Sequence, residues 1–169
     1  MSEFARPIRI DQLGASPLRV EIDASAEECA ALAARFALVS LGRLAAAAEI
    51  VRDGATIEAR GTIDAAVVQA CVATGDDVPS ILRDTFALRF VPEDREDAGE
   101  IELDEQALDT LPYTGGAIDL GEAAAQTLAL TLDPWPRAPV AQERLRAAGV
   151  VDEEARSPFA MLKGLGRPS

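Results

Sequence analysis

Carboxylates are the side chains of this sequence that could most readily do chemistry. The chain has 29 Asp and Glu residues against 16 Lys and Arg, with no histidine and two cysteines. Paired carboxylates can act as general acid and base, as they do in glycoside hydrolases. Nearly all of them here fall in predicted caps, turns or one charged loop, where hydration keeps a carboxyl pKa ordinary. We therefore expect no enzyme, and a small-molecule enzyme with Asp/Glu catalysis is the third hypothesis.

Other catalytic and cofactor sites lack the residues that they need. Without histidine the chain cannot form a Ser-His-Asp triad or a Cys-His dyad. Cys29 and Cys71 are far apart and cannot complete a tetrahedral zinc site. Gly115-Gly116 is explained by a turn and matches no phosphate-binding motif. We expect no cofactor and no metal.

Alternating apolar residues predict the strands that would position any site. Residues 38–52 and 56–72 read as two long strands joined at Asp53-Gly54, a strong hairpin signal. A further strand follows the break at 74–77, with Arg83 and Arg89 on one face and phenylalanines on the other. Two short strands joined by a turn are predicted within residues 6–22. The residues predicted to point inward are Leu44, Ala46, Ala48, Ile50, Ile57, Ala59, Ile63, Ala65, Val67, Leu82, Phe86, Leu88 and Phe90.

Two helices have recognisable starts. Ser25 and Glu28 form a capping box, and the helix that follows carries Cys29 on its apolar face. A second helix begins at Asp119 and ends before Asp133-Pro134. Its predicted apolar face consists of Leu120, Ala123, Ala124, Thr127, Leu128 and Leu130.

These elements predict an α+β fold, a mainly antiparallel sheet with two or three packed helices and an acidic loop. We expect a single α+β domain over residues 1–136, with the acidic loop near 93–109. Residues 137–169 are expected to form a short helix and a C-terminal tail. The alanine-rich strands imply that another layer, the helix after Ser25, approaches the sheet closely.

Charge constrains the class of partner. The net charge of −13 repels phosphate backbones, whereas affinity for nucleic acid is built by Lys and Arg. No apolar run approaches the ~20 residues that span a bilayer, and the N-terminus shows no secretion signal. We expect a cytoplasmic protein that binds neither membrane nor DNA.

Residues 93–109 hold nine acidic side chains and one basic one, a net charge of −8. Such a stretch has little to bury, so it is either a solvated insertion or an acidic docking arm for a cationic partner. Trp135, between two prolines, is either a core plug or an exposed recognition residue. The chain from Arg137 onward is mildly cationic.

The order of short segments resembles the YceD family. The central signature is carried by residues 69–74 (QACVAT), 78–79 (VP) and 86–90 (FALRF). The second signature is carried by residues 118–122 (IDLGE), 128–130 (LAL) and 133–137 (DPWPR). Residues 158–162 (PFAML) are similar to tails in the alphaproteobacterial branch of the family.

The resemblance implies a role in accumulation of large-subunit (23S) ribosomal RNA, hence in ribosome biogenesis, without catalysis. Many relatives carry Cys-x-x-Cys pairs that suggest a metal site. This chain keeps only Cys71, with Thr74 in place of its partner and no later pair, which argues for packing at a strand end.

The preferred hypothesis is an assembly factor that binds a basic ribosomal or RNA-processing protein, so that ribosomal RNA is reached indirectly. It would use the acidic loop and the exposed side of the sheet. The alternative is a domain that binds ribosomal RNA directly through an arginine patch. The candidate partner-binding residues are Arg83, Arg89, Glu93, Asp94, Glu96, Asp97, Trp135 and Arg137.

Overall fold

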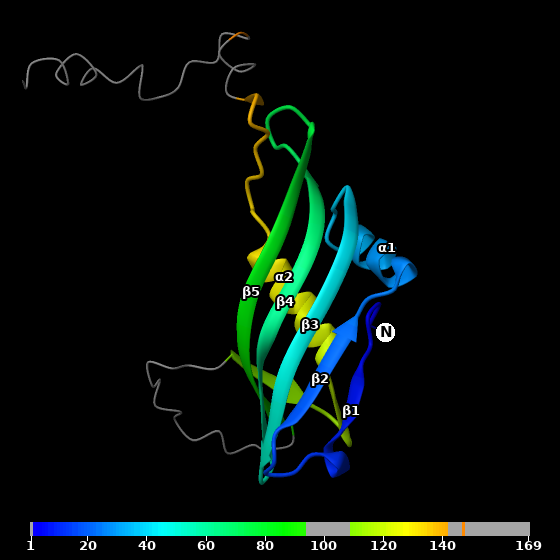
Figure 1. Ribbon diagram of the computed structural model, residues 1–169, viewed down its shortest axis with the longest axis vertical. Helices are drawn as coiled ribbons and strands as arrows, with labels where there is room; N and C mark the ends of the chain where they lie inside the picture. The colour runs from blue at the N-terminus through cyan, green and yellow to red at the C-terminus, as the bar shows by residue number, and fades with distance from the viewer. Residues whose placement is uncertain (1, 94–108, 142–146, 148–169) are drawn as a thin grey trace, which may run out of the picture. The chain divides into compact units, whose positions relative to one another are not determined.

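The structure is a computed structural model that describes residues 2–93, 109–141 and 147. Its main sheet has five strands in the order β2–β3–β4–β5–β6 (Figure 1). They are β2 (Leu18–Asp23), β3 (Ser40–Asp53), β4 (Thr56–Ala70), β5 (Asp77–Pro92) and β6 (Asp109–Tyr113). Both β2 and β4 run antiparallel to β3, whereas β6 runs parallel to β5. The predicted α+β class with a mainly antiparallel sheet is confirmed.

The predicted hairpin forms where Asp53-Gly54 signals it. Asp53 pairs with Thr56 across the turn, and Gly54 adopts a φ of 61°, which a side chain would disfavour. The residues predicted to face inward on β3 and β4 are buried. On β5, Phe86, Leu88 and Phe90 are buried as well, and Leu82 is partly buried against the same core.

The described residues contain two α-helices, α1 (Ala26–Arg35) and α2 (Leu120–Thr131). The capping box of α1 is confirmed: the Glu28 N–H donates to Ser25 Oγ at 3.2 Å, and the Ser25 N–H donates to Glu28 Oε2 at 2.8 Å. Helix α1 packs against β3, as the alanines predict. Cys29 is 4% exposed in this core, where burial raises the pKa of its thiol.

The two strands predicted within residues 6–22 exist, but they belong to different sheets. β1 (Pro7–Arg9) pairs with β7 (Ala117–Asp119), while β2 pairs with β3. The 3-10 helix η1 (Ile10–Gln12) separates them, and the Ile10 N–H donates to the Gly116 carbonyl at 2.9 Å. The chain therefore passes from the β1–β7 ribbon to the edge of the main sheet instead of closing a hairpin.

Leu130 was expected on the apolar face of α2, and this expectation is wrong. Its side chain is 82% exposed, whereas Ala125 is fully buried. Because each residue advances about 100° around a helix, Leu130 lies on the side opposite Leu128, which is fully buried.

One core covers one face of the sheet. Buried residues of α1, α2 and β7 share a cluster with the inner residues of β3, β4 and β5, and the partly buried Ile8 of β1 packs against it. Helix α2 lies behind these strands in Figure 1. Gly61 leaves room for this packing, because a Cβ there would lie 2.8 Å from Phe86 Cζ. The largest fully buried side chains of this core are Phe4, Leu32, Leu44, Ile50, Ile57, Ile63, Ile118, Leu120, Leu128 and Val67.

The N-terminal segment is fixed to the start of α2. Asp119 Oδ1 accepts hydrogen bonds from the N–H groups of Gly121 (3.0 Å), Glu122 (3.1 Å) and Arg6 (2.8 Å). One carboxylate thus caps the helix and also holds the incoming chain. A Cβ on Gly121 would overlap the carbonyl oxygen of Phe4, so glycine is needed for this approach.

An ion-pair cluster joins the N-terminus, α1 and α2. Arg35 Nη2 lies 2.7 Å from Glu122 Oε1, and its Nη1 lies 3.0 Å from Glu3 Oε2. Ser2 Oγ donates to Glu122 Oε2 at 2.9 Å. Arg35, followed by the hydrogen bonds from Gln126 and Ser2, lowers the pKa of Glu122 to about 2.

Contacts divide the described residues into two units. The first comprises residues 2–69, 79–93 and 109–134, and the second comprises 70–78, 135–141 and 147. The domain boundary at residue 136 stays a prediction. The acidic loop from 94 to 108 and most of the third helix and tail lie outside the described residues. Neither described helix is long and apolar enough to cross a membrane.

We predict that Ala37→Gly stabilises the protein. The N–H of Leu38 donates to the Ala33 carbonyl at 2.9 Å, which closes a Schellman-type end of α1, and Ala37 adopts a φ of 53° there. Glycine adopts this conformation freely, so urea unfolding should show a gain of about 0.5–1 kcal/mol. The matched control Ala30→Gly, exposed in the middle of α1, should lose about 1 kcal/mol. Equal changes in the free energy of unfolding for both variants would contradict the Schellman-type end of α1 at Ala37.

We predict that Gly121→Ala destabilises the protein by about 1–3 kcal/mol. Alanine favours a helix over glycine by about 1 kcal/mol, but the clash is with backbone atoms of Phe4 and outweighs this gain. Gly116→Ala is the control, since nothing lies within 4 Å of a Cβ there. Thermal unfolding should leave that control within about 0.5 kcal/mol of wild type.

We predict that Glu122→Gln weakens stability at neutral pH and removes part of its acid dependence. A carboxyl whose folded pKa is lowered to about 2 contributes stability above its unfolded pKa of about 4.3, and this is lost as the pH falls through 2. The side chain is 25% exposed, so we expect a cost of about 1–2 kcal/mol at pH 7 that shrinks towards pH 2. Glu21→Gln controls for the lost charge. Parallel pH curves for wild type and Glu122→Gln would contradict this.

Candidate functional site

The outer face of the sheet, opposite the helices, carries the predicted arginines. Arg83 and Arg89 lie on this face of β5, as their spacing predicts. Each is ion-paired: Arg83 Nε lies 2.8 Å from Asp64 Oδ2, and Arg89 Nη2 lies 3.2 Å from Glu58 Oε1. The pairing partners both come from β4, the neighbouring strand.

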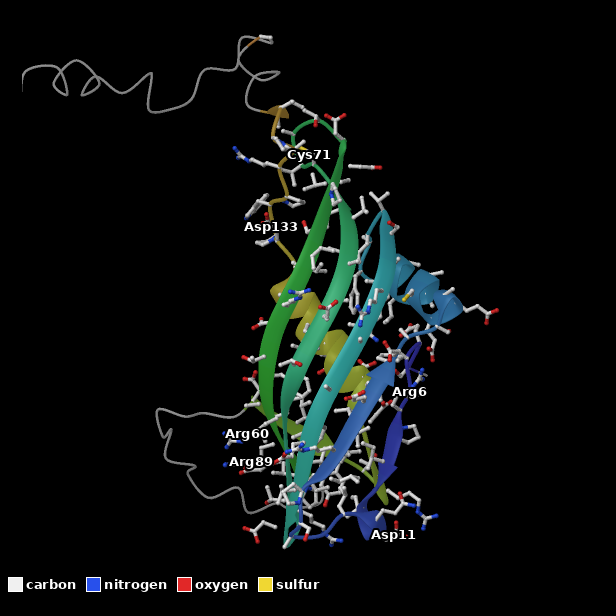
Figure 2. All side chains as sticks on the ribbon, viewed as in Figure 1. Arg6, Asp11, Arg60, Cys71, Arg89 and Asp133 are labelled. Carbon is white, nitrogen blue, oxygen red and sulfur yellow. The ribbon has the colours of Figure 1, made fainter. Side chains whose placement is uncertain are left out.

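These pairs extend across the sheet. Asp64 also pairs with Arg43 of β3 at 3.6 Å, so one carboxylate links three strands. Glu58 lies 3.5 Å from Arg60, and Figure 2 shows Arg60 and Arg89 close together on the sheet. Arginines and carboxylates share this face, which bears Arg19, Arg43, Arg60, Arg83, Arg89, Glu21, Asp23, Glu49, Asp53, Glu58 and Asp64. The face is a mixed lattice of charges and not a cationic patch.

The acidic candidates are only partly within the described residues. Glu93 is exposed at the end of β5, and its N–H donates to the Tyr113 carbonyl at 3.1 Å. Asp94, Glu96 and Asp97 lie outside the described residues. Of the predicted acidic stretch, the structure therefore places its two ends, Glu93 and Asp109.

Trp135 belongs to the second unit and is 71% exposed. The core-plug alternative is therefore wrong. Side chains alternate along this segment: Trp135 and Arg137 are exposed, whereas Pro136 and Ala138 are buried. The Val72 N–H donates to the Pro136 carbonyl at 2.9 Å, which fixes this alternation.

Cys71 is buried in the second unit, as a packing role predicts. It is 3% exposed and packs with Ala138 and Ala141. Its N–H donates to the Asp76 carbonyl at 2.8 Å. The Thr74 hydroxyl, followed by the backbone N–H of Ala138, lowers the pKa of the Cys71 thiol to about 7.

A metal site of the kind suggested by paired cysteines does not fit this chain. Cys29 and Cys71 are both unpaired, buried thiols in different units. Within residues 2–93, 109–141 and 147, no group of three His, Cys, Asp or Glu side chains could hold a metal ion. The Thr74 hydroxyl instead donates to Asp76 Oδ2 at 2.9 Å, as part of the turn.

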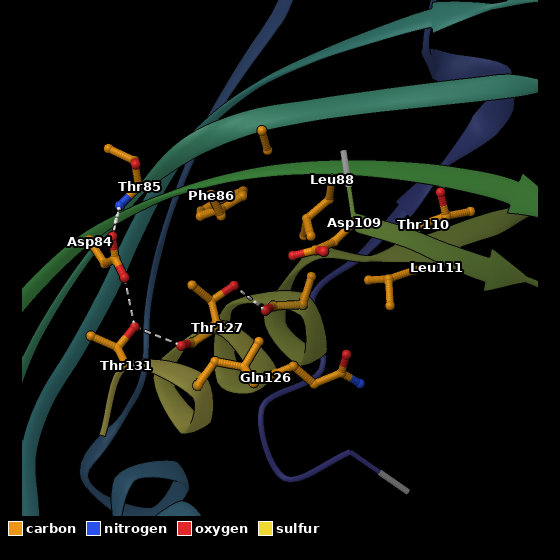
Figure 3. A pocket seen from close by; sticks show the side chains of 13 residues that line it. Asp84, Thr85, Phe86, Leu88, Asp109, Thr110, Leu111, Gln126, Thr127 and Thr131 are labelled. Atoms are coloured by element: carbon orange, nitrogen blue, oxygen red, sulfur yellow. Dashed lines mark hydrogen bonds between the residues drawn. The ribbon is translucent and has the colours of Figure 1, made fainter. Parts of the chain in front are cut away.

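A groove that the sequence did not indicate lies in the first unit. It has a volume of about 450 Å³ and runs between β5, the start of β6 and α2 (Figure 3). Exposed Leu130 lies on its helical side. The sequence signal that could have found it is the apolar residue on the polar side of α2, which we had assigned to the core.

Comparison with known proteins gives one match. The family model for the large ribosomal RNA subunit accumulation protein YceD matches residues 59–166. No curated protein and no solved structure matches the chain. The matched region contains most of β4 and all of β5, β6, β7 and α2, together with every candidate partner-binding residue. Because the match covers more than half of the sequence, the chain belongs to the YceD family, that of the large ribosomal RNA subunit accumulation protein.

Proposed function

We propose that this protein supports accumulation of large-subunit ribosomal RNA in the cytoplasm by binding a basic ribosomal or RNA-processing protein, without catalysis. The family supplies the role in ribosomal RNA accumulation. The observation that carries the mechanism is electrostatic: the candidate arginines Arg83 and Arg89 are both neutralised by carboxylates, within a chain of net charge −13.

This charge pattern favours a cationic partner. An acidic surface attracts basic proteins over distances of about a Debye length and raises their association rate. Ribosomal proteins that coat RNA carry many Lys and Arg residues, because they must neutralise phosphates. In this proposal the partner is attracted by the carboxylates of Glu93, Asp94, Glu96 and Asp97. Trp135 and Arg137, two residues apart, add an exposed aromatic ring and an exposed cation.

Direct RNA binding is the second candidate, and the ion pairs argue against it. The carboxylate of Asp64 lies 2.8 Å from Arg83 and 3.6 Å from Arg43, so it would repel a phosphate that approached either arginine, at a cost to binding. Unpaired arginines would gain phosphate contacts without that cost. Ribosomal RNA is thus reached through the protein partner.

Catalysis by Asp and Glu is the third candidate and has less support. A general acid at neutral pH needs a raised pKa. Each described carboxylate with a shifted pKa has it lowered, in most cases chiefly by a neighbouring arginine: Glu3, Asp11, Glu28 and Glu122. Backbone hydrogen bonding is the larger cause for Glu3. These groups stabilise the fold by staying ionised.

We predict that the purified protein retains a ribosomal or RNA-processing protein from lysate and releases it as the salt concentration rises. Neutralising the four acidic candidates together (Glu93→Gln, Asp94→Asn, Glu96→Gln, Asp97→Asn) should reduce recovery at least about fivefold. The matched control removes four other carboxylates: Asp11→Asn, Glu27→Gln, Asp53→Asn and Asp77→Asn. Quantitative mass spectrometry of the eluates measures the difference.

The same preparations decide between the candidates. Bare 23S ribosomal RNA fragments should not shift in gel electrophoresis at concentrations that saturate the protein partner. If a fragment shifts and the double variant Arg83→Gln, Arg89→Gln weakens it with a smaller salt dependence, the RNA-binding alternative is correct. Recovery of no ribosomal or RNA-processing protein would refute the proposal.

A further inference from the structure

The groove between β5 and α2 opens onto the edge of a strand. Within the described residues, β6 pairs with β5 only over Leu88–Pro92. The five consecutive residues 84–88 all line the groove. Because side chains alternate between the two faces of a strand, a run of consecutive lining residues means that the strand edge itself faces the groove. Among the described residues, no strand pairs with the part of β5 before Leu88 on this side, where its backbone groups face the groove.

Apolar surface lies beside this edge. Phe86 and Leu88 are 7% and 6% exposed and point from β5 towards α2 (Figure 3). Leu130 of α2 is 82% exposed and lines the same groove. An apolar side chain inserted here would have these residues as neighbours.

A hydrogen-bond chain sets the separation of the two walls. Thr131 Oγ1 lies 3.0 Å from Asp84 Oδ2 and 2.9 Å from the Thr127 carbonyl oxygen (Figure 3). The other carboxylate oxygen of Asp84 accepts the Thr85 N–H at 2.8 Å. The end of α2 is thereby tied to β5, so the groove is present before any partner arrives.

The charge of the groove is negative and differs from that of the outer face. Asp84 and Asp109 both line it, and Figure 3 shows Asp109 beside Leu88. Neither carboxylate forms an ion pair with an arginine of the described residues, whereas Glu58 and Asp64 on the outer face do. The groove combines an open strand edge, apolar side chains and uncompensated negative charge.

We propose that an extended segment of a partner protein adds to the edge of β5 as a further strand, with both apolar residues and lysine or arginine on its inward face. Its backbone bonds to β5 and an inward apolar side chain lies against Phe86 and Leu130. Inward cations on either side of it lie near Asp84 and Asp109, which share this face. This rests on the proposed function, since it specifies how the basic partner binds. A polynucleotide is disfavoured by the two aspartates, and a second copy of this chain by its own net charge of −13.

The test uses a fluorescent peptide of about eight residues, long enough to extend along the part of β5 before Leu88. Lysine and valine take turns at every second position of this peptide and threonine fills the positions between, so that lysine and valine face the same side of the added strand. We expect saturable binding by fluorescence anisotropy below about 1 mM. Methylating alternate backbone nitrogens of the peptide keeps its charge and side chains but removes edge hydrogen bonds, and should abolish binding. A peptide with glutamate in place of lysine should not bind.

Variants locate the peptide on the protein. Leu130→Lys places a positive charge, of the same sign as the peptide, at a largely exposed position in the groove and should weaken binding at least about fivefold. Asp84→Asn with Asp109→Asn should weaken it about threefold. Val39→Lys, at a side chain 51% exposed, and the double variant Glu21→Gln, Asp53→Asn are the matched controls and should bind as wild type. Thermal unfolding confirms that each variant is folded.

The outcomes separate this inference from the proposed function. No binding, equal binding of the methylated peptide, or binding unaffected by Leu130→Lys would overturn strand addition. Self-association that Leu130→Lys abolishes would assign the edge to a second copy and overturn it also. If the lysate partner is recovered equally by wild type and Leu130→Lys, the proposed function stands and the groove is not its site.

Discussion

Four alanines and a glycine stand among the larger apolar residues on the inner face of the sheet, and they let the layers of the protein come close together. Ala46, Ala48, Ala59 and Ala65 are almost fully buried between the strands and the helices. An alanine side chain is short and buries little apolar area, so the helices must lie close to the strands if no cavity is to remain between them. Two glycines allow this close packing. Gly61 leaves room for the ring of Phe86, and Gly121 lets the backbone of Phe4 approach α2.

Close packing on one face leaves the other face to water. Both helices and the β1–β7 ribbon share the single core of the first unit, so β3, β4 and β5 expose their opposite sides. The arginines and carboxylates there neutralise one another across adjacent strands. Such exposed pairs contribute little stability each, but they offset the positive charge of Arg43, Arg83 and Arg89.

Local signals in the sequence predicted much of this arrangement. The Ser25–Glu28 capping box, the Asp53-Gly54 turn and the alternation along β3 and β4 each depend on residues near in sequence, and each is observed. The pairing of β1 with β7 and the parallel placement of β6 depend on contacts between distant segments, which no local pattern encodes. The end of α1 was also hidden, because Ala37 occupies a position where glycine is usual.

The candidate site was less predictable, since it depends on what a residue faces. Arg83 and Arg89 were placed on the correct face of β5, but their ion partners on β4 are set by strand register. Trp135 and Leu130 look like core residues by type, and both are exposed. In α2 the buried residues Ala124, Ala125 and Leu128 already fill the core, and Leu130 lies on the other side of the helix. Its apolar side chain is therefore exposed without contributing to the core. Such an exposure beside an open strand edge is selected more readily by binding than by stability.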